Sequence, residues 1–226
     1  MKVGLISDIH SNMPALREVL SELKNRNVEK ILCAGDLVGY YTRPNEVVEK
    51  IREEDITCVK GNHDQGVEGG EFRFNPKARK ALRYSKEKLN HENKAFLREL
   101  DERKRIKLDN QDIFMAHGSP RRPVEEYVMP EDADKSSLSY FGEKPDVVML
   151  GHTHKAFSKE VEGVKIVNPG SVGKPRDKDP RASFAVLDTE SNSVEHFRTE
   201  YSKEKFAEEV RAELGDTLAE EILEGR

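Results

Sequence analysis

The stretch that decides the fold is KVGLISDIH, residues 2–10, in which a short apolar run is followed directly by an Asp-x-His pair. Apolar residues with helical spacing come next, from Pro14 to Arg26, and Pro14 suits a first helical turn. Strand-like, helical and strand-like segments follow at 28–34, 44–53 and 56–60. This alternation predicts a β-α-β-α-β unit, and therefore a mainly parallel sheet with right-handed crossovers.

Five short polar motifs stand in order along the chain, and each follows an apolar strand-like run. They are Asp8-x-His10, Gly35-Asp36, Gly61-Asn62-His63-Asp64, His117-Gly118 and Gly151-His152-Thr153-His154. Because sites in open α/β sheets assemble at the carboxyl ends of strands, five such ends can bring distant residues to one place. The motifs hold five of the seven histidines, and imidazole with carboxylate is a ligand set for zinc, manganese, iron and nickel.

Taken singly, the motifs differ in specificity. Asp-x-His arises by chance, Gly-Asp is a common turn pair, and a lone His117 is compatible with a hydrogen-bonded histidine near the core. Gly-Asn-His-Asp after a strand is more specific, as is the pair His152 and His154, which can both aim at a metal cluster. All five in order favour a metal site. The remaining histidines, His91 and His196, lie in polar stretches and are expected at the surface.

These motifs resemble those of the calcineurin-like metallophosphoesterase superfamily, whose pattern is D-x-H, G-D, G-N-H-[DE], H and G-H-x-H. Within it, the chain is similar to the small bacterial and archaeal branch of YfcE-type phosphodiesterases and diadenosine tetraphosphatase-like proteins. The resemblance covers residue 1 to about residue 200, and further matching stretches are Asp8–Asn12, Gly35–Gly39, Arg43–Val48, His117–Pro120 and Asn168–Gly173. It implies an α/β fold, a four-layer α/β/β/α sandwich with metals at one end.

By matching position, the resemblance implies two divalent metal ions, Mn²⁺ foremost, with Fe, Zn²⁺, Ni²⁺ and Mg²⁺ as alternatives. The implied ligands are Asp8, His10, Asp36 and His154 for one ion, and Asp36, Asn62, His117 and His152 for the other. A shared carboxylate suits two cations about 3.5–4 Å apart. A metal-bridging hydroxide would attack phosphorus, and His63 would act as the catalytic histidine that protonates the leaving oxygen. Asp64 could orient His63 or brace its loop.

The composition bounds the class of protein. A chain of 226 residues fits one domain, and we expect a single domain over 1–226 with a helical excursion at about 72–104 and a C-terminal helical tail at about 202–224. No apolar run is long enough to cross a bilayer, and the first residues carry no signal-peptide cleavage site. Cys33 and Cys58 are expected as buried free thiols, which predicts a cytoplasmic location.

Charge is distributed unevenly. Residues 71–107 carry thirteen Lys and Arg against six Asp and Glu, whereas residues 188–226 carry five against twelve. The basic stretch could cap the site and attract a nucleotide, or simply form solvated helix faces. The acidic tail could pack on the domain or form a homo-oligomer contact. Substrate contact or a purely structural role is open for the following residues: Arg121, Arg122, Ser171, Lys174, Arg176 and Arg181.

The sequence thus predicts a metal-dependent phosphoesterase that hydrolyses phosphodiester or phosphomonoester bonds of a small molecule, nucleotides included. The alternative is a non-catalytic metal-binding scaffold of the same fold, in which the catalytic histidine is replaced, and the presence of His63 favours the enzyme. No serine nucleophile elbow or phosphate-binding P-loop is present. A net charge of −5 and no DNA-binding module argue against a stable nucleic-acid complex.

Overall fold

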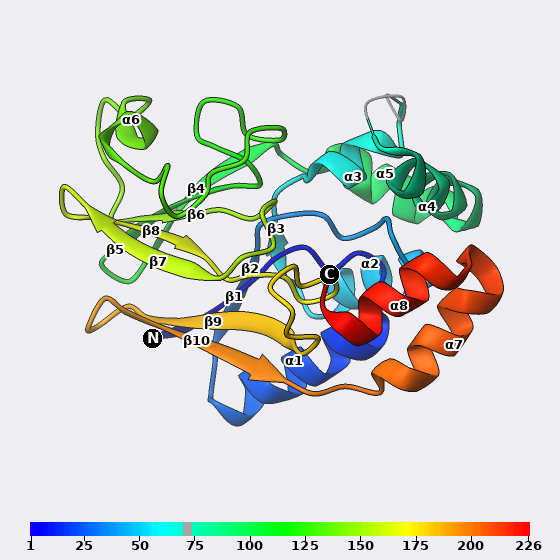
Figure 1. Cartoon of the computed structure of the whole chain (residues 1–226). Coiled ribbons are helices and arrows are strands. Elements are labelled where there is room, and N and C mark those ends of the chain that lie inside the picture. The colour runs from blue at the N-terminus through cyan, green and yellow to red at the C-terminus, as the bar shows by residue number, and fades with distance from the viewer. Residues whose placement is uncertain (70–73) are drawn as a thin grey trace.

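The computed structural model describes residues 1–69 and 74–226, and within these residues ten strands form two five-stranded sheets (Figure 1). The strands are β1 Lys2–Ile6, β2 Lys30–Cys33, β3 Thr57–Cys58, β4 Arg103–Leu108, β5 Gln111–Ala116, β6 Val147–Met149, β7 Phe157–Val161, β8 Val164–Asn168, β9 Ala182–Asp188 and β10 Ser193–Thr199. The first sheet has the order β10-β9-β1-β2-β3, and the second has the order β4-β5-β6-β8-β7. Each sheet therefore mixes strands from distant parts of the chain.

Each sheet contains three neighbouring parallel strands. These are β1, β2 and β3 in the first sheet, and β5, β6 and β8 in the second. The predicted β-α-β-α-β unit is confirmed, although β3 spans two residues rather than 56–60. The other strands run antiparallel to their neighbours, so both sheets are mixed. Six parallel strand ends, three from each sheet, are thereby available to build a site.

Helices flank the two sheets (Figure 1). They are α1 Met13–Asn25, α2 Pro44–Glu53, α3 Asn62–Gly66, α4 Pro76–Lys88, α5 His91–Glu99, α6 Lys135–Leu138, α7 Lys203–Leu214 and α8 Asp216–Glu224. One apolar core lies between the first sheet and its helices, a second between the two sheets, and a third on the outer face of the second sheet. The predicted four-layer α/β fold is confirmed, and its layer over the second sheet is thin, because it consists of α6 and irregular chain.

Strand β1 shows how the sequence produces these layers. Side chains alternate across a strand, so Val3 and Leu5 enter the core between the sheets while Ile6 enters the core on the helix side. Gly4 also faces α1, and a Cβ at this position would lie 2.9 Å from a methyl group of Leu23. The glycine therefore permits α1 to pack closely on the sheet.

The basic helix α4 packs along the acidic helices α7 and α8. Lys77 forms an ion pair with Glu221, and the Lys80 ammonium donates to the carbonyl oxygen of Leu214 at 2.7 Å. The tail residues with helical spacing are buried, as at Val210. The basic segment and the acidic tail thus contact each other within one molecule, and the tail packs on the domain of the same chain.

Two strands and one histidine differ from the sequence prediction. The sequence predicts further strands at 112–116, 146–150, 164–167, 183–188 and 193–198, and β5, β6, β8, β9 and β10 lie there. Strands β4 and β7 were not predicted, because both are edge strands rich in charged residues, a composition that edges use and central strands avoid. The prediction that His196 lies at the surface is wrong, since this residue is half-buried on β10 and its Nε2 lies 3.1 Å from the carbonyl oxygen of Asn168. His91 is exposed and both cysteines are buried and free, as predicted.

Parts of the predicted helical excursion, and the charges of Glu71 and Arg73, lie outside the described residues. Helices α4 and α5 occupy its described part. Within residues 1–69 and 74–226, no helix is long and apolar enough to cross a membrane.

Candidate active site

The side chains that follow β1, β2, β5 and β6 meet in two groups. Asp8, His10 and His154 form the first, with the Nε2 atoms of the two histidines 3.3 Å apart and Asp8 Oδ1 3.2 Å from His154 Nε2. Asp36, His117 and His152 form the second, in which His117 Nε2 lies 3.0 Å from His152 Nδ1.

Asp36 lies between the two groups. Its Oδ2 is 3.6 Å from His10 Nε2 and 3.3 Å from His117 Nε2, so one carboxylate oxygen faces both. Asn62 joins the second group, because its Oδ1 lies 3.1 Å from His117 Nε2. The structure therefore brings together all seven residues for which a ligand role was predicted.

Each aspartate uses one carboxylate oxygen for hydrogen bonds and turns the other toward the histidines. Asp8 Oδ2 accepts from the Ser7 hydroxyl at 2.7 Å and from the His152 amide at 3.1 Å, while Asp8 Oδ1 is buried without a hydrogen-bond partner among the described residues. Asp36 Oδ1 accepts from the His63 amide at 2.8 Å. A buried carboxylate oxygen without a donor is costly unless a cation lies beside it.

Backbone carbonyls fix the proton on each histidine of the two groups. Nδ1 of His10 lies 3.1 Å from the Val38 carbonyl oxygen, Nδ1 of His117 lies 2.7 Å from that of Ala34, and Nδ1 of His154 is bonded to that of Lys174. For His152, Nε2 lies 3.2 Å from the carbonyl oxygen of Glu125. A carbonyl oxygen only accepts, so each of these nitrogens carries a proton and the other ring nitrogen points inward.

The pKa values follow from burial and from the two aspartates. Burial holds the pKa of His10 and His154 well below its usual range and lowers that of His152 to about 3, so these imidazoles are neutral. Burial alone would lower the pKa of His117, but the charge of Asp36 raises it to about 9. Burial raises the pKa of Asp8 to about 6.

These features fit a pair of divalent cations. Four imidazole nitrogens, an amide oxygen and two carboxylates converge. Several of these ligand atoms face one another at 3.0–3.3 Å, and a cation between them would bind their lone pairs. In the metal-free protein, the positive charge of protonated His117 partly balances the negative charge of Asp36 in place of a cation. Among the described side chains, Asp36 faces both groups, as a shared carboxylate does in two-metal sites.

The backbone around the ligands is strained. Asp8, His10, Asp36, His152 and His154 all have left-handed φ values, between 51° and 67°. Such conformations cost about 1–3 kcal/mol each and persist where the surrounding structure holds them. Here hydrogen bonds between neighbouring loops do so, as from the amide of His10 to the Asp36 carbonyl oxygen at 3.0 Å.

His63 lies beside the two groups. Its ring packs 4.7 Å from that of Tyr40 and 4.8 Å from those of His10 and Phe74, and its Nδ1 has no hydrogen-bond partner among the described residues. Burial lowers its pKa to about 4. Unlike the other four site histidines, His63 has no carbonyl oxygen of residues 1–69 or 74–226 that fixes its proton, so within this part of the chain its ring is free to donate to a bound molecule.

Asp64 has the structural role. Its carboxylate accepts hydrogen bonds from the amides of Asp36, Leu37 and Gly61, at 2.9 Å in each case. It ties the Gly-Asp loop to the Gly-Asn-His-Asp loop, and its hydrogen bonds within the described residues go to backbone amides rather than to the His63 ring. Gly61 is required at this junction, because a Cβ there would lie 2.0 Å from Asp36 Oδ1.

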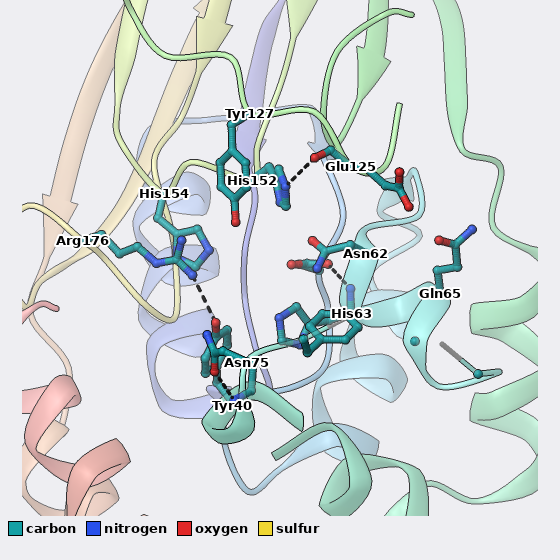
Figure 2. A pocket seen from close by; sticks show the side chains of 15 residues that line it. Tyr40, Asn62, His63, Gln65, Asn75, Glu125, Tyr127, His152, His154 and Arg176 are labelled. Carbon is teal, nitrogen blue, oxygen red and sulfur yellow. Dashed lines mark hydrogen bonds between the residues drawn. The ribbon is translucent and has the colours of Figure 1, made fainter. Parts of the chain in front are cut away.

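A cavity of about 540 Å³ opens onto the two groups (Figure 2). Its described lining residues are Asp36, Tyr40, Asn62, His63, Gln65, Gly66, Gly69, Phe74, Asn75, Ala78, Glu125, Tyr127, His152, His154 and Arg176. Figure 2 shows Tyr127 beside His152, and the two rings stack with centroids 3.8 Å apart. The cavity is large enough for a substrate that extends well beyond a phosphate group.

A family model for the calcineurin-like phosphoesterase superfamily domain matches residues 1–192. The chain belongs to this superfamily. An uncharacterized protein of Methanocaldococcus jannaschii is 35% identical over 99% of this chain and 98% of its own length, and a phosphodiesterase of the same organism is 28% identical over 84% and 94%. The crystal structure of a metallophosphoesterase from Sphaerobacter thermophilus matches with a TM-score of 0.84 at 33% identity, covering 100% of this chain and 99% of that one.

Membership of the superfamily confirms the predicted phosphoesterase class. The resemblance to the YfcE-type branch is also confirmed, since the phosphodiesterase YfcE of Escherichia coli is 24% identical over 86% of this chain and 91% of its own. Metal binding is a property of this class, and the two side-chain groups above hold its candidate ligands. His10, Asp36 and His63 form a third set whose ligand atoms lie within 4.8 Å of one another.

The loop from Asn168 to Arg181 has mixed roles. Asn168 donates to the carbonyl oxygen of Gly151 at 2.7 Å, and the Ser171 hydroxyl donates to that of Asp8 at 2.7 Å, so both brace ligand loops. Lys174 is buried against Glu221, and Arg181 is paired with Asp179. Arg121 and Arg122 are exposed and paired with Glu126 and Glu125. Arg176 alone among these basic residues lines the cavity.

The sequence prediction missed two tyrosines of the cavity. Tyr40 directly follows the matching stretch Gly35–Gly39 and has a left-handed φ of 53°, so its position next to that motif was the available signal. Tyr127 lies on the irregular segment before α6, where no pattern marks it. Its contact with His152 depends on the fold alone.

Proposed function

We propose that the protein is a binuclear metal-dependent phosphoesterase that hydrolyses phosphodiester or phosphomonoester bonds of a small molecule. The observation that carries the proposal is the pair of ligand groups joined by Asp36 Oδ2. Asp8, His10, Asp36 and His154 would hold one ion, and Asp36, Asn62, His117 and His152 would hold the other. When bound, the cations would polarise the phosphate and lower the pKa of a water molecule between them.

The chain itself orients these groups and excludes water. Ser7 and the His152 amide fix the Asp8 carboxylate, and the carbonyl bonds of the histidines fix their rings, so little rearrangement is needed on binding. Most of the ligands are buried, and the electrostatic attraction between the centre and a phosphate is correspondingly strong.

His63 is proposed as the residue that acts on the leaving group. It lines the cavity, and its ring is held between Tyr40 and Phe74. A neutral imidazole carries one N–H that can donate to the leaving oxygen, and an anionic substrate beside it raises its pKa toward the range suited to proton transfer.

Nucleotides are the substrate class that we propose first. The cavity of about 540 Å³ extends past the metal ligands to Gln65 and Asn75, which offer amide groups to a base or sugar. Among the described residues, no lysine or arginine of the basic segment 74–107 lines the cavity, so an electrostatic cap has no support from the contacts. Mn²⁺ is the proposed ion, because mixed Asp, Asn and His ligands accept it.

The proposal is tested by hydrolysis of bis-p-nitrophenyl phosphate and p-nitrophenyl phosphate by chelator-stripped protein, with and without added Mn²⁺. We expect turnover only with metal, and the ratio of the two rates gives the diester or monoester preference. The absence of turnover with any divalent ion in a protein that binds two ions would contradict the proposal and favour the non-catalytic scaffold.

A further inference from the structure

Arg176 is the only lysine or arginine among the described residues that line the cavity. Figure 2 shows it on the His154 side, across the cavity from Gln65. It is partly buried, and it lies on the loop between β8 and β9 rather than in any of the five metal motifs.

The cations around Arg176 differ from it in having acidic partners. Lys174 pairs with Glu221, Arg181 with Asp179, and Arg198 with Asp177. Among residues 1–69 and 74–226, no carboxylate lies within ion-pair distance of Arg176. Glu125 lines the same cavity, but it pairs with Arg122 at 3.4 Å.

A tyrosine holds the guanidinium in place. Arg176 Nη2 donates to the Tyr40 hydroxyl at 3.2 Å. Tyr40 is only 4% exposed and its ring packs 4.7 Å from both His10 and His63, so the hydroxyl has a fixed position relative to the ligand groups. The bond to a neutral hydroxyl orients Arg176 without neutralising it.

The charge of Arg176 acts on the site. The Arg176 guanidinium lines the same cavity as His154 and His152. Two divalent ions held by Asp8 and Asp36 already leave an excess of positive charge, and Arg176 adds to it. A partly buried guanidinium without an acidic partner is stabilised by an anion that enters the cavity.

We propose that Arg176 binds the non-bridging oxygens of the substrate's phosphate group, and that Tyr40 positions it. This inference rests on the proposed function, because it assigns the phosphate of that substrate to a residue outside the metal motifs. The planar fork of a guanidinium matches two oxygens of one phosphate, which a lysine ammonium does not.

The test is calorimetric binding of inorganic phosphate to the Mn²⁺-loaded protein. Arg176→Met should weaken binding about tenfold or more, as expected for loss of a charged hydrogen bond, and Arg176→Lys should fall between this variant and wild type. The matched control is Arg181→Met on the same loop, which removes an equal charge away from the cavity and should stay within about twofold. Mn²⁺ content and circular dichroism show that each variant is folded and loaded.

The role of Tyr40 is tested in combination with Arg176. Tyr40→Phe should weaken phosphate binding in the wild-type background and have no further effect in Arg176→Met, because the hydroxyl acts through the guanidinium. An equal effect of Tyr40→Phe in both backgrounds would overturn its positioning role.

The results separate this inference from the proposed function. Phosphate binding by Arg176→Met within about twofold of wild type, or equal weakening by Arg181→Met, overturns the assignment of Arg176 even if the protein hydrolyses phosphate esters. Phosphate binding that depends on Arg176 in a protein without hydrolytic activity supports the assignment and contradicts the proposed function. No phosphate binding by the loaded wild type overturns the assignment.

Discussion

The cavity has two unlike walls, and they depend on different features of the sequence. The metal-facing wall consists of loops that follow strands, with strained backbones and histidines fixed by carbonyl oxygens. The other wall, which is the remainder of the lining, comes from α3, α4 and the segments around Tyr127 and Arg176, which have no common backbone pattern. A metal centre needs fixed donors at short range, whereas a substrate wall needs only a shape and a few polar groups. The first wall therefore gives a sequence motif and the second does not.

His63 lies where the two walls meet, and removing it should separate their functions most sharply. We expect His63→Ala to keep its bound metal and to lose about 10²–10⁴-fold in kcat, because proton donation to the leaving oxygen is lost. Metal analysis alongside steady-state kinetics checks both parts. Loss of metal from this variant would show that His63 is a ligand and that the boundary between the walls is misplaced.

The absence of a side chain at Gly39 leaves room for the His63 ring. Gly39 has a φ of 91°, and a Cβ at this position would lie 2.1 Å from His63 Nδ1. Gly39→Ala should therefore displace the ring and lower kcat by about tenfold or more, since small displacements of a catalytic group have large effects. Gly163→Ala is the matched control, because Gly163 also has a positive φ, of 82°, but no atom lies within 4 Å of its added Cβ. Equal losses of activity in both variants would mean that backbone strain, not the His63 contact, is responsible.

Metal binding to the metal-facing wall should release a proton from His117, whereas ligand binding to the substrate wall should not. With its pKa raised to about 9, His117 is protonated at neutral pH in the metal-free protein, and a cation must displace that proton. Apparent Mn²⁺ affinity should rise with pH below about 9, and binding at pH 7 should release about one proton from this group. Calorimetry in buffers of different ionisation enthalpy counts the protons. An affinity that does not change between pH 6 and 8 would contradict this coupling.

Sequence reasoning predicted the residues of the metal-facing wall and the β-α-β-α-β unit, but not the strand order of the two mixed sheets. Asp8, Asp36 and His117 each follow an apolar strand, and strand ends are where α/β sheets gather their sites. The edge strand β4 was missed because its charged side chains alternate with half-buried ones and mimic a polar helix or loop. Arg176 could not be separated from Arg181 in sequence, because only the fold turns one into the cavity and the other to Asp179.

Charge reversal on the basic helix α4 should have the smallest effect on activity. Lys77 and Lys80 contact the C-terminal helices rather than the cavity, so replacing both by glutamate should lower the melting temperature while leaving KM for a nucleotide within about twofold. Like charges opposite Glu221 account for the loss of stability. A clear rise in KM without a change in stability would support the hypothesis of an electrostatic cap and would make α4 part of the substrate wall.

The measurement that tests the central claim most directly is the Mn²⁺ stoichiometry and affinity of wild type, Asp36→Asn and His152→Ala, by calorimetry on chelator-stripped protein. Because Asp36 Oδ2 faces both ligand groups, we predict two ions per wild-type chain, weakened binding of both ions in Asp36→Asn, and weakened binding of one ion in His152→Ala. A single ion per wild-type chain, or an Asp36→Asn variant that loses one ion and binds the other unchanged, would contradict a centre joined by a shared carboxylate.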